Sequence, residues 1–304
     1  MKKKIIALFL ALTLVLSATA CSAQSTSDTS TQTDTSSEQT DSANESSTDQ
    51  TEETSTTDSS TEKQEDLPEP GTLEALEVDV MKDVETSIVA LQSEMDTLVA
   101  EITTFDKYVE NADRMEAFYT KACTDSLLLE ICLMEHAVTY AEFIINSNTD
   151  FDDKYDDLDE LYDVVYEDAG DEFYDGIYDG ILDEMYDIFY DELLDNAYDN
   201  APYEKWLDAR SNEYEWWLDA RSDCYEIWLD TRSDIYEFWL DLRSATYEKD
   251  ADEVAEIITD FQKDIEELKT ELCFLQALFG HCCKIFLDIV ACPFWTKLQS
   301  AGQP

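Results

Sequence analysis

The chain has 304 residues, of which 72 are acidic and 19 basic, and its formal net charge is −53. This balance excludes nucleic acid as a partner, because phosphate binding needs a basic surface. It also disfavours broad contact with an anionic lipid surface. Six glycines, five prolines and a hydrophobic fraction of 44% predict long helices and a body that folds.

Residues 1–20 have the pattern of a secretory signal peptide. In MKKKIIALFLALTLVLSATAC, a basic start precedes an apolar run that is too short for a membrane span, and small residues precede Cys21. The ending resembles the lipobox of bacterial lipoproteins, with Ala18 where a lipobox usually carries Leu. The resemblance implies a diacylglyceryl group on Cys21 and a lipid anchor at the outer face of the cytoplasmic membrane. Ordinary cleavage after Ala20, giving a secreted protein, is the alternative.

Residues 21–71 are predicted to form a disordered tether. Ser, Thr, Asp, Glu and Gln dominate this stretch, so it has too little apolar surface to offset the entropy of ordering. A coil of this length spans about 40 Å root-mean-square, at ~5–6 Å times the square root of the residue number. Such a tether would carry a folded body away from the membrane.

Two helices are predicted over residues 72–148. Apolar residues in alternating steps of four and three predict a coiled-coil stripe on the first helix: Val84, Ile88, Leu91, Met95, Leu98, Ile102, Phe105 and Val109. The second helix, about Ala112–Ile145, is apolar enough to be buried on more than one face. His136 within it is interpreted as a core residue.

A third helix is predicted over about Phe151–Asp199, with an aspartate at every fourth position from Asp171. Like charges at this spacing repel by about 0.2–0.5 kcal/mol per pair. A period of four drifts by about 40° per step on a 3.6-residue helix, so the aspartates are expected to wind around it. Gly176 and Gly180 are interpreted as slack in this helix, not as points of close approach.

Four eleven-residue units follow Pro202: YEKWLDARSNE, YEWWLDARSDC, YEIWLDTRSDI and YEFWLDLRSAT. Eleven residues make almost three turns, so Tyr, Trp, Leu and Arg return to one side of a long helix. The region loosely resembles uncharacterised Tyr/Trp-repeat helical lipoproteins of Gram-positive bacteria, a similarity that implies no activity. Together, residues 149–250 predict an antiparallel coiled-coil hairpin that folds about Ala201.

Arginines of the repeat are predicted to register this hairpin by reaching acids across its seam: Arg210, Arg221, Arg232 and Arg243. We expect Arg210 opposite the region of Glu192 and Arg221 opposite Asp179–Asp183. We expect Arg232 opposite Asp168–Asp171 and Arg243 opposite Asp159–Glu160. The tryptophans have two interpretations, as packed hairpin side chains or as aromatic platforms for a ligand: Trp206, Trp217, Trp228 and Trp239.

Residues 251–280 predict a third bundle helix, and residues 281–304 an apolar, cysteine-containing tail. The predicted fold is therefore all-α, with a hairpin projecting from a three-helix bundle behind a disordered tether. Apart from Cys21, seven of the eight cysteines remain, so at least one is free or pairs between molecules.

No catalytic motif and no metal site are predicted, and no cofactor is expected. The run DFDDKYDDLDEL departs from an EF-hand, and carboxylates on a straight helix point apart, which leaves loose Ca²⁺ or Mg²⁺ association as an alternative. The sequence is interpreted as a non-enzymatic cell-surface spacer, scaffold or contact element. Its partners would be the membrane, through the lipid on Cys21, and a cell-wall or surface polymer or another envelope protein. The alternative is a binding module for glycan or peptide that uses the hairpin aromatics.

Overall fold

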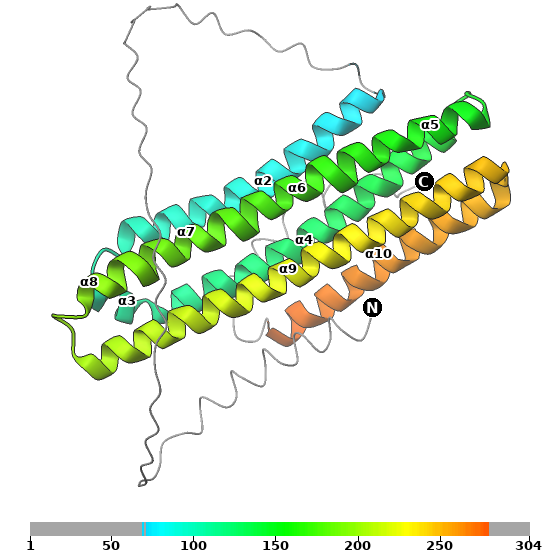
Figure 1. The fold of residues 1–304 in the computed structure, drawn as a ribbon. Coiled ribbons are helices and arrows are strands. Elements are labelled where there is room, and N and C mark those ends of the chain that lie inside the picture. Colours follow the sequence, from blue (N-terminus) through cyan, green and yellow to red (C-terminus); the bar gives the residue numbers. More distant parts are fainter. Residues whose placement is uncertain (1–68, 70, 280–304) are drawn as a thin grey trace, which may run out of the picture. The chain divides into compact units, whose positions relative to one another are not determined.

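The computed structural model describes residue 69 and residues 71–279 (Figure 1). The predicted signal peptide, Cys21, almost all of the tether and the tail 281–304 lie outside the described residues. Within the described part every regular element is helical and no strand occurs, which confirms the all-α class.

The first predicted helix ends earlier than its apolar stripe suggested. Helix α2 spans Leu73–Glu101, and the chain leaves the helical conformation at Ile102 before the short helix α3, Phe105–Glu110. The Thr104 side chain accepts the Lys107 N–H and starts α3. This restart rotates the stripe, so that Tyr108 is buried and Val109 is exposed. Expecting Val109 in the stripe was therefore wrong.

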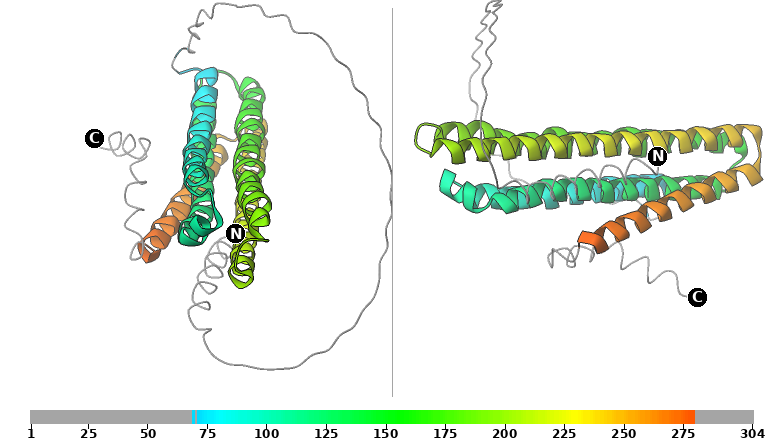
Figure 2. Two further views of the ribbon diagram at one scale, coloured as in Figure 1. Left: turned by 90° about the vertical axis from the view of Figure 1, so that its left-hand side faces the viewer. Right: turned by 90° about the horizontal axis from the view of Figure 1, so that it is seen from below.

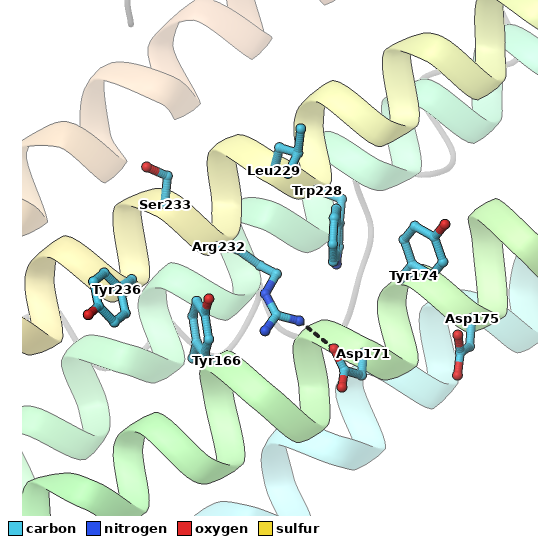
Figure 3. A pocket seen from close by; sticks show the side chains of 9 residues that line it. All are labelled: Tyr166, Asp171, Tyr174, Asp175, Trp228, Leu229, Arg232, Ser233 and Tyr236. Atoms are coloured by element: carbon cyan, nitrogen blue, oxygen red, sulfur yellow. Dashed lines mark hydrogen bonds and ion pairs between the residues drawn. The ribbon is translucent and has the colours of Figure 1, made fainter.

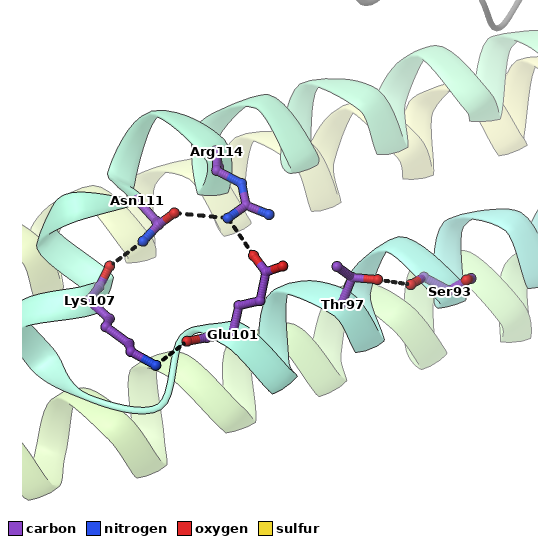
Figure 4. A network of polar contacts seen from close by, with 6 residues as sticks. All are labelled: Ser93, Thr97, Glu101, Lys107, Asn111 and Arg114. Carbon is purple, nitrogen blue, oxygen red and sulfur yellow. Dashed lines mark hydrogen bonds and ion pairs between the residues drawn. The ribbon is translucent and has the colours of Figure 1, made fainter.

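Polar contacts hold the turn between α2 and helix α4, Ala112–Ile145 (Figure 4). Lys107 Nζ donates to the Glu101 carbonyl at 2.9 Å, and Arg114 pairs with the Glu101 carboxylate at 2.7 Å. The Asn111 side chain bridges the two, because it donates to the Lys107 carbonyl and accepts from Arg114.

The third helix alternates between α and π geometry. It begins with α5, Phe151–Leu161. Three π segments follow, η2 Tyr162–Asp168, η3 Tyr174–Ile181 and η4 Asp187–Leu194, and they are separated by α6 Ala169–Phe173, α7 Leu182–Tyr186 and α8 Asp195–Ala197. Backbone angles at the junctions stay helical, so the chain forms one continuous helix from Phe151 to Ala197.

The π segments overturn the expected winding of the aspartates. Each π bulge adds one residue without adding a turn, so twelve residues here make the three turns that eleven make in a regular helix. Side chains twelve apart therefore return to one face. A helix with four residues per turn brings every fourth side chain to the same face, which explains the four-residue spacing of the aspartates.

Helix α9, Tyr203–Glu248, and helix α10, Ala251–Phe279, complete the described part. Lys249 closes α9 in the left-handed conformation, with φ of 61°. The Asp250 carboxylate then accepts the N–H groups of Asp252 and Glu253 and caps α10.

The helix pair α5–α8 and α9 runs antiparallel but does not project from a bundle. Helix α9 packs most extensively against α4, α6 and η3 contact α2, and α10 covers α4 and α9 (Figure 2). The reason lies in α4, which carries buried side chains around most of its circumference and needs neighbours on every side. The expected projecting hairpin and separate three-helix bundle are replaced by one packed body.

The interpretation of Gly176 as slack was wrong. A Cβ placed there would lie 2.4 Å from Cδ1 of Ile88, so α2 approaches the π-containing helix closely at this point. A Cβ at Gly180 would lie 2.8 Å from the Asp175 carbonyl oxygen. Both glycines therefore have a steric role.

Candidate functional site, a repeated arginine–aromatic seam

The constant and variable positions of the eleven-residue unit lie on different faces of α9. The seventh and eleventh positions vary in sequence and are buried: Ala209, Ala220, Thr231 and Leu242, and Glu213, Cys224, Ile235 and Thr246. They lie on the face packed against α4 and α10, which have no repeat, so each unit needs its own side chains there. The constant Tyr, Trp and Arg positions contact the π-containing helix, which carries a matching repeat.

One unit of the contact is drawn in Figure 3 and is called a rung here. Arg232 forms an ion pair with Asp171 of the opposite helix. Its guanidinium carbon lies 4.1 Å from the ring centroid of Tyr166 and 5.3 Å from that of Trp228. The Trp228 Nε1–H donates to the Gly170 carbonyl at 2.8 Å.

Four rungs repeat the ion pair and the stacking along the seam, and in the second rung the indole of Trp217 donates to the Asp183 carboxylate in place of a backbone carbonyl. The arginine–aspartate pairs are Arg210–Asp195, Arg221–Asp183, Arg232–Asp171 and Arg243–Asp159. The tyrosines under the four guanidinium groups are Tyr190, Tyr178, Tyr166 and Tyr155, with carbon-to-centroid distances of 4.1, 4.4, 4.1 and 4.3 Å. The arginines are eleven residues apart and the aspartates twelve, so the π bulges keep the two repeats in register.

The four predicted registering arginines therefore all lie in the seam. Arg221 also reaches Asp179, at 3.5 Å, and Arg243 meets Asp159, within the stretches expected for them. Arg210 pairs with Asp195, one turn from the expected Glu192. Each ion pair is partly exposed, so it contributes about 0–1 kcal/mol, and stacking on tyrosine adds about 0.5–1 kcal/mol.

The four tryptophans lie inside the seam and are at least partly covered. Indole N–H groups donate to the backbone carbonyls of Leu194, Gly170 and Leu158, from Trp206, Trp228 and Trp239 respectively. The backbone N–H groups of Tyr162 and Tyr198 donate to carbonyls three residues back, those of Asp159 and Asp195. The carbonyls four residues back, those of Leu158 and Leu194, therefore accept from the indoles. These contacts make the tryptophans part of the packing.

Tyrosine and leucine, not tryptophan, form the solvent-facing part of each unit. Leu207, Leu218, Leu229 and Leu240 are 43–46% exposed, and Tyr225 and Tyr236 are each 39% exposed. Between the two helices an open groove is lined by Tyr166, Tyr174, Trp228, Leu229, Arg232 and Tyr236 (Figure 3). A ligand lying along α9 would meet an apolar side chain and a tyrosine in every unit.

A buried carboxylate holds α9 to the α3–α4 region at the first unit. Glu213 is fully buried and accepts hydrogen bonds from Tyr108 Oη at 2.7 Å and Tyr119 Oη at 2.6 Å. Burial raises the pKa of Glu213 to about 7, although the two tyrosine hydrogen bonds oppose the rise. Neither tyrosine lies in a pattern that pointed to this contact, so sequence reasoning missed it.

The tyrosines of the rungs were also missed, although a signal was present. Tyr166, Tyr178 and Tyr190 recur every twelve residues, each four residues after another tyrosine. A twelve-residue tyrosine repeat next to an eleven-residue repeat of similar length was a signal that the two helices pair along one seam. Cys21 lies outside the described residues, so its lipidation stays a prediction.

No family model, no curated protein and no solved structure matches this chain. Among the helices of residues 71–279, none has the length and apolar character needed to cross a membrane.

Proposed function

We propose that this protein is a non-catalytic lipoprotein, anchored through Cys21 at the outer face of a bacterial cytoplasmic membrane, whose helical body is an acidic spacer, scaffold or contact element of the envelope. One observation carries the proposal: identical side chains recur in four rungs at intervals of about 16.5 Å, eleven residues at 1.5 Å each. Such a repeat suits a stiff element or a periodic contact surface better than chemistry at one centre.

The anchor is tested by labelling. Cells that express the chain are grown with radiolabelled palmitate, and the protein is followed in membrane and soluble fractions. The wild-type chain should carry label and sediment with membranes, and Cys21→Ser should lose both. An unlabelled wild-type chain in the medium would instead support the plain secreted alternative.

The contact role is tested on the outward face of α9. We expect crosslinking on intact cells to join the full chain to an envelope component, and Leu218→Ser with Leu229→Ser to weaken that link. Glu215→Gln with Glu237→Gln is the matched control, because these side chains are also exposed on α9 but are not apolar. Equal crosslinking by both double variants would argue against contact through the leucines and leave only the spacer role.

A second candidate, a binding module for glycan or peptide, is supported by the open groove of Figure 3. Tyrosine rings can stack on sugar faces, and the tyrosine and leucine types that line the groove recur in every unit of α9. A glycan array probed with the full chain should then give signals that fall with Tyr225→Ala and Tyr236→Ala. The tyrosines are preferred to the tryptophans because Tyr225 and Tyr236 are each 39% exposed, whereas three of the indoles hydrogen-bond across the seam. Tyr225 and Tyr236 also touch the opposite helix, so helicity by circular dichroism checks that their variants keep the fold.

A further inference from the structure

Three side chains with metal-binding atoms meet between α2 and α4, away from the seam. Cys132 and His136 are one turn apart on α4, and Asp83 faces them from α2. One ligand atom of each lies within 4.8 Å of the other two. His136 Nε2 and Asp83 Oδ2 are 3.0 Å apart. We propose that Asp83, Cys132 and His136 bind a divalent transition-metal ion, with Zn²⁺ as the best fit.

The distances suit a tetrahedral ion. Zinc binds imidazole nitrogen and carboxylate oxygen at about 2.0–2.2 Å and thiolate sulfur at about 2.3 Å, which places the nitrogen and oxygen ligands roughly 3.3 Å apart. The His136–Asp83 separation of 3.0 Å needs to open by only a few tenths of an ångström. Cys132 Sγ lies within 4.8 Å of the other two ligand atoms, and rotation of its side chain is needed to bring it to the roughly 3.6 Å of a tetrahedral site.

The donor set selects the class of metal. A thiolate and an imidazole favour Zn²⁺ and its neighbours in the transition series, whereas Ca²⁺ and Mg²⁺ prefer oxygen ligands only. The negative charges of the Asp83 carboxylate and the Cys132 thiolate would balance a divalent ion, and the thiol proton leaves when the metal binds. This site differs in chemistry from the loose Ca²⁺ or Mg²⁺ association considered for the acidic surface.

Burial at the site is uneven in a way that suits binding. His136 is 7% exposed, so its ring is fixed by packing, while the Asp83 side chain is 35% exposed and gives an ion a route from solvent. Three protein ligands leave a fourth position for water. Sequence reasoning missed this site because Asp83 is 53 residues from His136, although Cys132 and His136 are four residues apart on one helix.

The test uses the full chain in a background that isolates the site. Cys21, Cys273, Cys282, Cys283 and Cys292 are replaced by Ser and His281 by Ala, so that the tail cannot bind the metal. The protein is titrated with Co²⁺ and then with Zn²⁺. We expect one equivalent of Co²⁺ to give a thiolate-to-metal charge-transfer band, and Zn²⁺ to remove that band.

Variants distinguish the site from the acidic surface. Cys132→Ser should abolish the charge-transfer band, and Asp83→Asn should weaken binding at least tenfold. Cys123→Ser, at a buried thiol elsewhere on α4, should leave the band unchanged. Asp83 is partly exposed, so its variant is expected to fold, and helicity by circular dichroism checks this. Absence of the band in the background protein, or its persistence in Cys132→Ser, would overturn the proposal and leave His136–Asp83 as a hydrogen-bonded pair.

Discussion

Glu213 occupies a position where the next unit carries Cys224 and the later ones carry Ile235 and Thr246. A buried carboxylate in place of these smaller or apolar groups is costly unless it is neutral or well hydrogen-bonded. Tyr108 and Tyr119 supply the hydrogen bonds, yet the pKa of Glu213 still rises to about 7. Between pH 4.5 and about 7, Glu213 therefore stays protonated in the folded protein and would lose its proton in the unfolded chain.

This proton makes the free energy of unfolding depend on pH. The carboxyl pKa is higher in the folded state, so the contribution of Glu213 is fully present below pH 4.5, its ordinary pKa, and is lost as the pH rises through about 7. The loss is on the order of 3 kcal/mol. We expect Glu213→Gln to match wild type near pH 4.5 and to be more stable at pH 8, as measured by urea unfolding. A difference that does not change with pH would contradict this assignment.

Gly176 allows a matched comparison within one helix. Gly176→Ala places a methyl group 2.4 Å from Ile88 Cδ1, whereas Gly170→Ala places one no closer than 3.8 Å to Arg232. Both changes raise helix propensity by up to about 1 kcal/mol, but overpacking at Gly176 costs about 1–3 kcal/mol. We expect Gly176→Ala to lower the melting temperature and Gly170→Ala to keep or raise it. Equal effects would mean that Ile88 moves aside freely.

At the scale of elements, the pairing of a twelve-residue repeat with an eleven-residue repeat determines the seam. Twelve residues of the π-containing helix must cover the same axial distance as eleven residues of α9. One π segment between successive rungs has this effect, so each arginine meets its aspartate. Removal of two rungs should therefore weaken the pairing of the two helices directly.

We expect Arg221→Ala with Arg232→Ala to lower the free energy of unfolding by roughly 2 kcal/mol, about 1 kcal/mol per rung after solvent screening. Arg114→Ala is the control, because the exposed Arg114–Glu101 pair at the α2–α4 turn should contribute less than about 0.5 kcal/mol. Urea unfolding followed by circular dichroism measures both. Unchanged stability in the double variant would refute the registering role of the rungs.

The elements differ in how far the sequence predicts them. Regular periods of 3.5 and 3.67 residues per turn predict helices correctly, because these periods belong to a single helix. The π segments, the turn at Ile102 and the close approach at Gly176 depend on a partner helix, and a pattern judged on one ideal helix misses them. The same holds for the Asp83, Cys132 and His136 cluster, because Asp83 reaches the two side chains of α4 only through tertiary packing.

At the scale of the whole molecule, helix α4 explains why the repeat helices lie flat against the body. Helices α2, α5, α9 and α10 all contact it, so removing residues 149–250 would expose its apolar faces. Experiments on the repeat should therefore use surface substitutions in the full chain. The outward face of α9 can be changed in this way without disturbing the packing against α4.

Asp223 and Asp234, which lie on α9 like Glu213, are partly buried acids. Burial, with help from Asp219 and Glu226, raises the pKa of Asp223 to about 7. Burial, with Asp230, Glu237 and Asp264, raises that of Asp234 to about 6. Both shifts have the sign found for Glu213, so these acids also favour the folded state at low pH. The net charge of −53 adds self-repulsion at high pH.

Salt should separate general screening of this charge from specific ion binding. Screening of exposed carboxylates depends on ionic strength, so NaCl and MgCl₂ at equal ionic strength should raise the melting temperature at pH 8 by similar amounts, with a smaller rise at pH 5, where the buried acids hold protons. CaCl₂ should act like MgCl₂, because the acidic face of a straight helix cannot wrap one ion. A rise that saturates at one or two equivalents of Ca²⁺ would contradict loose counterion association, since only a site with converging ligands binds in that range.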